Sequence, residues 1–273
     1  SAILHNADLA EKGAIYKFNS FGALVWCVCL FIANGGRMHF GANTLLWGCI
    51  YGITQALFIL FKTAAMNSGP VSITTLIGNC SLVVSVVVCF ILWEEPISLA
   101  DMIGLALLML GLTLATYKKS SGTFTKKWAV LSFLFLVLGA GVGITFKAFG
   151  KSGGTAHTSD MMIVAAFVML ISYTAICIFT GGFASKSNKY TKKEKRLFII
   201  LALVSGLLSC LYNRLNIYLS GALDGVIFFP SFNGGVVVLS TVVSMIIFKE
   251  KLSAKQLIGL LLGISGICII GIL

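Results

Sequence analysis

The chain has 273 residues, of which 58% are apolar and only 11% are charged, and its formal net charge is +11. About a quarter of the residues in a soluble globular domain are charged, so this composition excludes an ordinary soluble protein. The positive charge does not indicate nucleic-acid binding, because the basic residues cluster at the ends of apolar runs rather than on a basic domain with interleaved aromatic residues.

Nine apolar runs are each long enough to cross about 30 Å of hydrocarbon as an α-helix. In chain order, we predict transmembrane helices over residues 18–35, 43–66, 71–93, 99–117, 127–147, 159–182, 196–220, 225–248 and 254–273. The connections are mostly short and carry helix breakers, as in the sequence Asn67-Ser68-Gly69-Pro70. The sequence therefore predicts an all-α, multi-pass protein of the cell inner (plasma) membrane, in which neighbouring helices run antiparallel.

Basic residues are distributed unevenly between the two sets of alternate loops. One set carries Lys12, Lys17, Lys118, Lys119, Lys126, Lys127, the run "KSNKYTKKEKR" over residues 186–196, and Lys249, Lys251 and Lys255, whereas the other carries Arg37, Lys147 and Lys151. Because cytoplasmic loops of membrane proteins are enriched in Lys and Arg, we predict that the first set faces the cytoplasm.

The cysteines and histidines do not form a pattern typical of metal or disulfide sites. All eight cysteines lie inside the apolar runs, where a free Cys acts as a small hydrophobic residue. The three histidines, His5, His39 and His157, lie in or near loops and have no paired Cys or His at metal-ligand spacing. We therefore predict neither a metal site nor a cofactor.

Two segments of the chain repeat the same pattern, "EPISLADMIGLALLMLG" over residues 95–111 and "EKLSAKQLIGLLLGISG" over residues 250–266. A shift of 155 positions places Glu95 on Glu250, Ser98 on Ser253, Gly104 on Gly259 and Gly111 on Gly266. Small residues on one face of a membrane helix allow another helix to approach closely. We interpret the chain as two copies of one unit whose glycines serve helix packing.

The fifth apolar run begins near Lys126, and 155 positions before Lys126 is a position before Ser1. We therefore expect a protein of five plus five helices, of which this sequence carries four plus five and lacks the first. Residues 1–117 are the expected first repeat, and residues 118–273 are the second. Since five is odd, successive repeats enter the membrane from opposite sides, which predicts an inverted repeat of the kind that secondary transporters use.

The helices before the two repeated segments carry a second part of the pattern. They read "MNSGPVSITTLIGNCSLVVSVVVCFILWEE" over residues 66–95 and "LDGVIFFPSFNGGVVVLSTVVSMIIFKE" over residues 223–250. With these blocks, essentially the whole chain resembles the drug/metabolite transporter superfamily in its ten-helix EamA-type form. Pro230 lies 20 residues before Glu250, as the family pattern has it, whereas the first copy has Thr75 at the corresponding position.

That resemblance implies a ten-helix transporter fold without a defined substrate, because the superfamily includes carriers of amino acids, sugars, nucleotide derivatives and drugs. The family usually places both chain termini in the cytoplasm. That orientation is opposite to the one the lysine distribution predicts, and we favour the charge-based orientation.

Breaks in the third and eighth predicted helices indicate where a substrate would bind. Transporters of this kind bind near the bilayer midplane, beside helices whose regularity is interrupted. The third helix contains Gly78-Asn79, and the eighth contains Pro230 followed by Asn233. Asn79 and Asn233 are therefore candidate substrate-binding residues. The alternative is that they form interhelical hydrogen bonds, each worth about 0.6 to 2 kcal/mol.

Two basic residues lie within apolar runs, Lys62 in the second and Arg214 in the seventh. Each lies six residues before a serine-glycine pair, Ser68-Gly69 and Ser220-Gly221 respectively, so we interpret them as repeat partners. A buried cation costs at least about 2.5 to 3.5 kcal/mol on insertion scales and needs a partner. Either both snorkel to the interface, or both face a central cavity and bind an anionic group, with Asn213, Asn216 and Gln55 nearby.

Together these features predict a secondary transporter that moves a small polar metabolite, such as an amino acid or organic anion, by alternating access. No carboxylate lies in the middle of a predicted helix, which favours facilitated transport or exchange and leaves a proton-coupled multidrug or metabolite exporter as the alternative. A channel or an intramembrane enzyme is a further alternative, although no predicted helix contains a histidine or a nucleophile-base pair. The expected partners are a small-molecule substrate and the lipid bilayer, without nucleic acid; the oligomeric state is not predicted.

Overall fold

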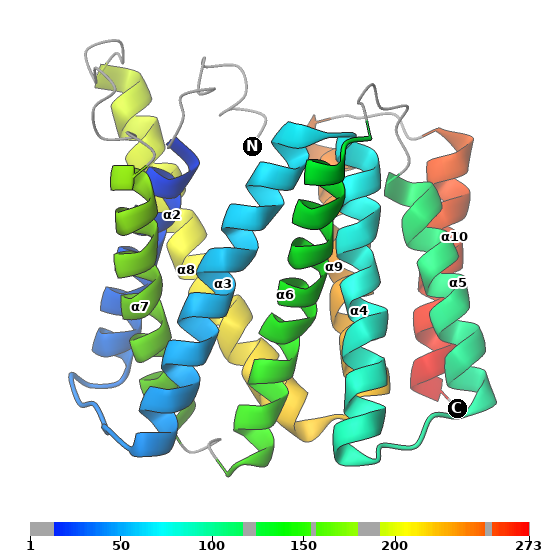
Figure 1. The fold of residues 1–273 in the computed structure, drawn as a ribbon, viewed down its shortest axis with the longest axis horizontal. Coiled ribbons are helices and arrows are strands. Elements are labelled where there is room, and N and C mark those ends of the chain that lie inside the picture. Colours follow the sequence, from blue (N-terminus) through cyan, green and yellow to red (C-terminus); the bar gives the residue numbers. More distant parts are fainter. Residues whose placement is uncertain (1–13, 117–123, 154–156, 180–191, 249–252, 273) are drawn as a thin grey trace. The chain divides into compact units, whose positions relative to one another are not determined.

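The structure, a computed structural model, describes residues 14–116, 124–153, 157–179, 192–248 and 253–272. These residues contain no strand, and their α-helices are α2 (Ala14–Ala33), α3 (Ala42–Ser68), α4 (Val71–Trp93), α5 (Leu99–Thr116), α6 (Lys126–Lys151), α7 (Thr158–Phe179), α8 (Lys192–Ala222), α9 (Gly225–Phe248) and α10 (Ala254–Ile272), drawn in Figure 1.

The nine predicted helices are confirmed. Helices α4 and α9 begin and end at the predicted residues, and the largest difference is four residues, at the start of α2 and α8 and at the end of α6. Each of the nine helices is long and apolar enough to cross a membrane. The described part of the chain therefore has the character of a multi-pass membrane protein.

The chain divides into two compact units. Unit 1 contains residues 1–56 and 153–218, and unit 2 contains residues 57–152 and 219–273. In unit 1, α2 packs along α7, where the hydroxyls of Ser20 and Thr174 are 2.8 Å apart. Helix α3 also lies close to α7, because a Cβ atom at Gly52 would be 2.7 Å from Val168. Small residues thus allow these helices of unit 1 to approach closely.

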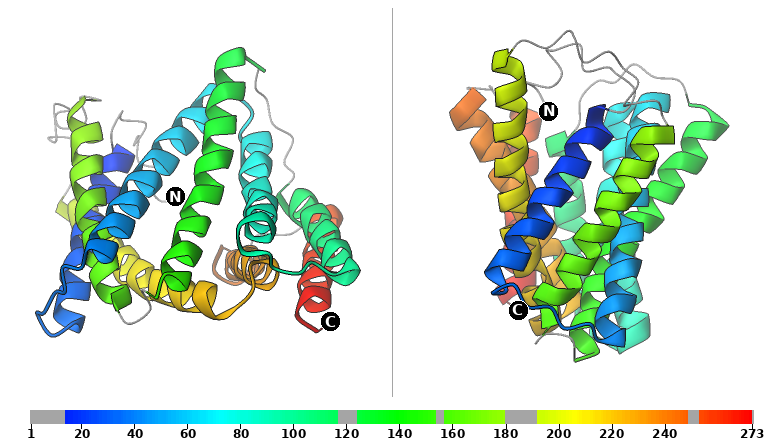
Figure 2. Two further views of the ribbon diagram at one scale, coloured as in Figure 1. Left: turned by 60° about the horizontal axis from the view of Figure 1, so that its bottom comes forward. Right: turned by 90° about the vertical axis from the view of Figure 1, so that its left-hand side faces the viewer.

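Unit 2 contains α4, α5, α6, α9 and α10 together with the ends of α3 and α8. Helix α4 packs against α6 and α9, and α5 packs along α10 (Figure 1). The left-hand view of Figure 2 also shows α5 and α10 side by side. A buried apolar cluster joins α4, α5 and α9, and its members are Leu82, Val86, Cys89, Leu108, Leu112, Val226, Phe228 and Phe229.

Helices α5 and α10 begin with the same capping arrangement. The amide of Ser98 donates to the carboxylate of Asp101 at 2.9 Å, and the amide of Asp101 donates to the hydroxyl of Ser98 at 3.1 Å. At the start of α10, Ser253 and Gln256 exchange the corresponding bonds at 3.0 and 3.3 Å. This reciprocal arrangement is a capping box, which satisfies amides that have no partner inside the helix. The repeated sequence therefore has a repeated structural role.

Glycines bring α5 and α10 into backbone contact along a line that we call the glycine seam, formed by Gly104, Gly111, Gly259 and Gly266. A Cβ atom at Gly104 would be 2.8 Å from the carbonyl oxygen of Gly266, and one at Gly111 would be 2.6 Å from that of Gly259. Because real Cβ atoms do not approach backbone atoms so closely, any side chain here would force the helices apart. The packing role that the sequence predicted for these glycines is confirmed.

Candidate functional site

Glu95 lies in the short connection between α4 and α5, directly after a backbone reversal. Helix α4 is capped by Glu94, which has a left-handed conformation with φ of 51°, unusual for a residue other than glycine. Pro96 follows, and a proline restricts the residue before it to an extended conformation. The Glu95 side chain is buried, whereas Glu94 is exposed.

The carboxylate of Glu95 forms an ion pair with Lys147, which lies near the end of α6. The distance from Oε1 of Glu95 to Nζ of Lys147 is 2.6 Å, and the side chains are 5% and 0% exposed, respectively. Lys151, one turn further along α6, approaches the same oxygen at 3.7 Å, but 42% of its side chain is exposed. One carboxylate thus faces two lysines, of which only Lys147 is fully buried.

The same two side chains also bind the connection between α8 and α9. Oε2 of Glu95 accepts a hydrogen bond from the amide of Gly225, the first residue of α9, at 2.6 Å. Lys147 donates from Nζ to the carbonyl oxygen of Leu223 at 3.1 Å. A carboxylate is favoured at a helix N-terminus because the amides there have no partner within the helix. We call Glu95, Lys147, Gly225 and the carbonyl of Leu223 the Glu95 cluster.

Burial makes the Glu95 cluster sensitive to the loss of either charge. Removing two charges from water costs several kcal/mol per ion, which close pairing and additional hydrogen bonds offset. Loss of one partner leaves an uncompensated buried charge, and this typically costs about 3 to 5 kcal/mol. The cluster therefore adds a charge-dependent contact between the ends of α4 and α6 and the start of α9, beside the apolar packing of these helices.

Asn213, a predicted binding residue, lies in a polar group within unit 1. Its Oδ1 accepts a hydrogen bond from the hydroxyl of Tyr51 on α3 at 3.1 Å, and its Nδ2 donates to the carbonyl of Ser209 at 2.8 Å. Tyr51 and Asn213 are both buried. Gln55 lies one turn after Tyr51 on α3, and its Oε1 is buried without a hydrogen-bond partner. Unit 1 thus brings Tyr51 and Asn213 together and leaves a carbonyl oxygen of Gln55 unsatisfied.

Asn79 and Asn233, the other two predicted asparagines, lie in unit 2. Nδ2 of Asn79 on α4 is buried without a hydrogen-bond partner. Asn233 is exposed and donates to the carbonyl of Phe229 at 2.9 Å, one turn back along α9 and next to Pro230. Buried polar atoms without partners are rare in proteins, and those that occur mark strain, bound water or a ligand. Asn79 is thus the stronger binding candidate of the two.

Lys62 and Arg214 belong to different units, and each is described within its own unit. Lys62 on α3 is half-buried, and its Nζ lies 5.9 Å from the centre of the Phe58 ring, within the range of a cation–π contact. The Phe58 ring in turn packs against Phe135 of α6, with ring centres 5.0 Å apart. Arg214 on α8 is exposed in unit 1. Neither forms an ion pair with a carboxylate of a described residue.

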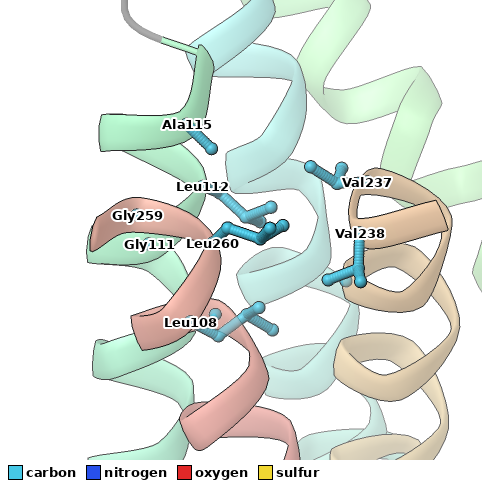
Figure 3. Close-up of a pocket in the computed structure, with 10 residues that line it drawn as sticks. Leu108, Gly111, Leu112, Ala115, Val237, Val238, Gly259 and Leu260 are labelled. Carbon is cyan, nitrogen blue, oxygen red and sulfur yellow. The ribbon is translucent and has the colours of Figure 1, made fainter. Parts of the chain in front are cut away.

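A small gap between α5, α9 and α10 has the wrong chemistry for a polar substrate. Its lining, shown in Figure 3, consists of Leu108, Gly111, Leu112, Ala115, Gly234, Val237, Val238, Gly259, Leu260 and Gly263. The cavity volume is about 10 Å³, roughly the space of one water molecule, and the lining is apolar. It is a packing gap beside the glycine seam.

Sequence reasoning missed the Glu95 cluster. It placed Lys147 among the loop lysines because this residue ends the predicted apolar run, but α6 continues to Lys151 and Lys147 is buried inside the helix. The available signal was a single basic residue within "GITFKAFG" over residues 143–150. The role of Tyr51 was missed because tyrosine was counted among the apolar residues.

Some predictions fall outside the described residues. Glu250, Lys249 and Lys251, and most of the basic run over residues 186–196, lie there. The orientation in the membrane, which depends on these lysines, stays a prediction.

Comparisons with known proteins support the fold and leave the family open. No family model matches the chain. A protein of Haemophilus influenzae (strain ATCC 51907 / DSM 11121 / KW20 / Rd), described only as an uncharacterized protein, is 24% identical over 218 residues, which cover 79% of this chain and 71% of that protein. A solved crystal structure is similar with a TM-score of 0.69 and 15% sequence identity, over 94% of this chain and 87% of the other. At this level of identity, the likeness shows a shared fold.

Proposed function

We propose that the protein is a secondary transporter of the EamA type, which moves a small polar metabolite across the membrane by alternating access between two inverted repeats. The observation that carries this proposal is the reciprocal packing of α5 and α10 along the glycine seam. The proposal extends to the localisation of the protein in the inner (plasma) membrane.

Reciprocal contacts along the seam support an inverted repeat. Under the shift of 155 positions, Gly104 corresponds to Gly259 and Gly111 to Gly266, yet Gly104 packs on Gly266 and Gly111 packs on Gly259. Such an exchange of partners is what a two-fold axis between two copies produces, as in a symmetric dimer interface. At the middle of the seam, Leu108 lies next to Gly263, which is its own counterpart under the shift of 155 positions. A Cβ atom at Gly263 would be 3.7 Å from Cδ1 of Leu108.

The preceding pair of helices has the direction that the same axis requires. Cys89, near the end of α4, lies against Gly225, at the start of α9, so the two helices run antiparallel (Figure 1). In transporters, two halves with opposite orientation can exchange conformations, so outward-open and inward-open states become related alternatives.

The half-buried Lys62 supports a substrate with an anionic group. A cation among apolar helices is costly without a partner, and no carboxylate of a described residue lies within ion-pair distance of Lys62. A substrate carboxylate or phosphate would supply the missing charge. We propose that the substrate is an anionic or zwitterionic metabolite. The candidate binding residues, each within its own unit, are Lys62, Asn79 and Asn233 in unit 2 and Gln55, Asn213 and Arg214 in unit 1.

Transport measurements on charge-neutralising variants test this proposal. Arg214→Gln and Lys62→Gln should each reduce saturable uptake of the substrate by at least about tenfold, the effect of losing one charge-assisted contact. Lys151→Gln is the matched control because it also removes a lysine, one whose side chain is 42% exposed, and it should transport normally. Normal uptake with an unchanged half-saturation concentration in both Arg214→Gln and Lys62→Gln would contradict the anion site.

A proton-coupled form of the same transport is the second candidate, favoured by the buried carboxylate of Glu95. Intramembrane carboxylates commonly serve as proton relays in transporters. Its pairing with Lys147 neutralises the charge, which favours facilitated transport or exchange. Uptake that is driven by an imposed pH gradient across the liposome membrane would select the proton-coupled form.

A further inference from the structure

We propose that the Glu95 cluster is a conformational latch, which holds α4, α6 and the start of α9 together in one state of the transport cycle and opens in the other. This inference rests on the proposed transport function and goes beyond it by naming the contact that must break. The cluster lies entirely within unit 2.

Three helices meet at the latch through only two side chains. Glu95 follows α4 and Lys147 belongs to α6. Their partners are the amide of Gly225, the first residue of α9, and the carbonyl of Leu223, two residues before it. Loss of the Glu95–Lys147 pair therefore weakens the polar contacts of all three helix ends at once and leaves only their apolar packing. An apolar contact cannot be released in this way, because its strength is spread over many atoms.

The first turn of α9 is also set apart from the rest of that helix. Pro230 lies five residues after Gly225 and has no amide hydrogen to donate to the carbonyl of Val226. Proline is a common cause of a kink in a helix. Residues 225–229 are thus joined to the rest of α9 through a weakened turn. The latch binds their first residue, and Val226, Phe228 and Phe229 pack in the buried apolar cluster.

Movement of these residues would change the surroundings of a native cysteine. Cys89 on α4 is 1% exposed and lies against Gly225, where a Cβ atom would be 2.7 Å from its sulfur and 2.9 Å from its Cβ. Disulfides need Cβ atoms about 3.5 to 4.5 Å apart, so a cysteine at position 225 needs only a small shift to bond Cys89. Gly225 is itself a member of the latch, and a Cβ atom there would also be 3.1 Å from Oε2 of Glu95, so a cysteine at this position can lock or probe the latch through the Cys89 thiol.

A reversible disulfide tests whether the latch must open. In a protein that lacks the other seven native cysteines, Gly225→Cys is oxidised by copper(II) phenanthroline: two Cu(II) ions accept the two electrons, and the two thiol protons pass to the buffer, as the sulfur–sulfur bond forms. We expect the oxidised protein to lose at least nine tenths of its uptake, and dithiothreitol to restore it. If the cross-linked protein transports as fast as the same protein after dithiothreitol treatment, the latch is overturned. A contact that stays closed throughout transport is merely structural.

Two controls match the variant in size. Gly225→Ser introduces a side chain of nearly the same volume that cannot cross-link, and Gly225→Cys combined with Cys89→Ser removes the partner sulfur. Both should transport equally with and without oxidant. Loss of uptake in the second control on oxidation would show that the oxidant acts elsewhere and would overturn the assignment.

Labelling of Cys89 tests the latch without a substrate. In the background where it is the only cysteine, its reaction with a charged maleimide should be at least tenfold faster in Glu95→Gln and Lys147→Met than in the parent. Glu94→Gln and Lys151→Met are the matched controls and should label at the parental rate. Equal labelling in all five proteins overturns the latch. Faster labelling in a protein that moves no metabolite would retain the latch and reject the transport function.

Discussion

The glycine seam and the Glu95 cluster both join helices of unit 2, but by opposite means. The seam has no polar side chain and brings backbones so close that a Cβ atom at Gly111 would lie 2.5 Å from the amide nitrogen of Gly263. The Glu95 cluster depends on one ion pair of 2.6 Å and two hydrogen bonds to the backbone. The first contact is set by shape, and the second is set by charge.

This difference indicates which contact can change during a working cycle. Backbone packing without side chains has no alternative partner, so α5 and α10 are expected to move as one body. A buried ion pair is stable only while both charges are present, so a change in hydration or in a competing charge can release it. The predictions below test this distinction between the shape-based and the charge-based contact, in order of decreasing effect.

Lys147→Met should be the most destabilising of these changes, because it leaves Glu95 buried without its cation. The expected loss in the free energy of unfolding is about 3 to 5 kcal/mol, whereas Lys151→Met should cost under about 1 kcal/mol because its side chain is largely exposed. Thermal unfolding in detergent measures both. Combining Lys147→Met with Glu95→Leu should recover most of the loss, since no buried charge remains. Equal losses of stability in Lys147→Met and Lys151→Met would contradict the claim that the buried ion pair of the Glu95 cluster is a charge-based contact.

Gly111→Ala should destabilise the seam by about 2 to 3 kcal/mol, because backbone atoms of α10 cannot make room for the new methyl group. Gly235→Ala is the matched control in α9, where no atom lies within 4 Å of the added Cβ. The control should be neutral or stabilising by up to about 1 kcal/mol, because alanine favours a helix more than glycine does. A tolerated alanine at position 111, measured in the same unfolding assay, would mean that α5 and α10 pack loosely.

Ser98→Ala and Ser253→Ala should have small and equal effects, since each removes a capping box at the start of a seam helix. Loss of an N-cap typically costs about 1 kcal/mol. Unfolding of the two single variants and the double variant measures whether the costs add. A large difference between the two serines would argue against equivalent roles for the repeated segments.

Much of the fold of this protein could be predicted because membrane helices leave strong local signals. Apolar runs bounded by Ser-Gly-Pro or Gly-Ala-Leu-Asp marked the ends of α3 and α8, and the starts of α4 and α9 followed directly. The capping pairs Ser98–Asp101 and Ser253–Gln256 are likewise only three residues apart in the sequence, within one helical turn. Such short-range patterns need no knowledge of tertiary contacts.

The candidate site could not be predicted in the same way, because its contacts join residues far apart in the chain. Glu95 and Lys147 are 52 positions apart, and Tyr51 and Asn213 are 162 positions apart. Sequence reasoning could select Asn213 as a polar residue in an apolar run, but it could not supply its partner. It also could not distinguish the exposed Arg214 from the buried Lys147, since both stand as single cations near the end of an apolar run.

Counterflow in proteoliposomes tests the central claim, that the protein is an alternating-access carrier, most directly. Vesicles containing the purified protein are loaded with an excess of an unlabelled anionic or zwitterionic metabolite, chosen by its thermal stabilisation of the protein, and a trace of the labelled compound is added outside. A carrier should accumulate the label transiently above its equilibrium level, with a rate that saturates as the external concentration rises. Rapid flux that neither saturates nor shows this overshoot would contradict the account and would identify a channel instead.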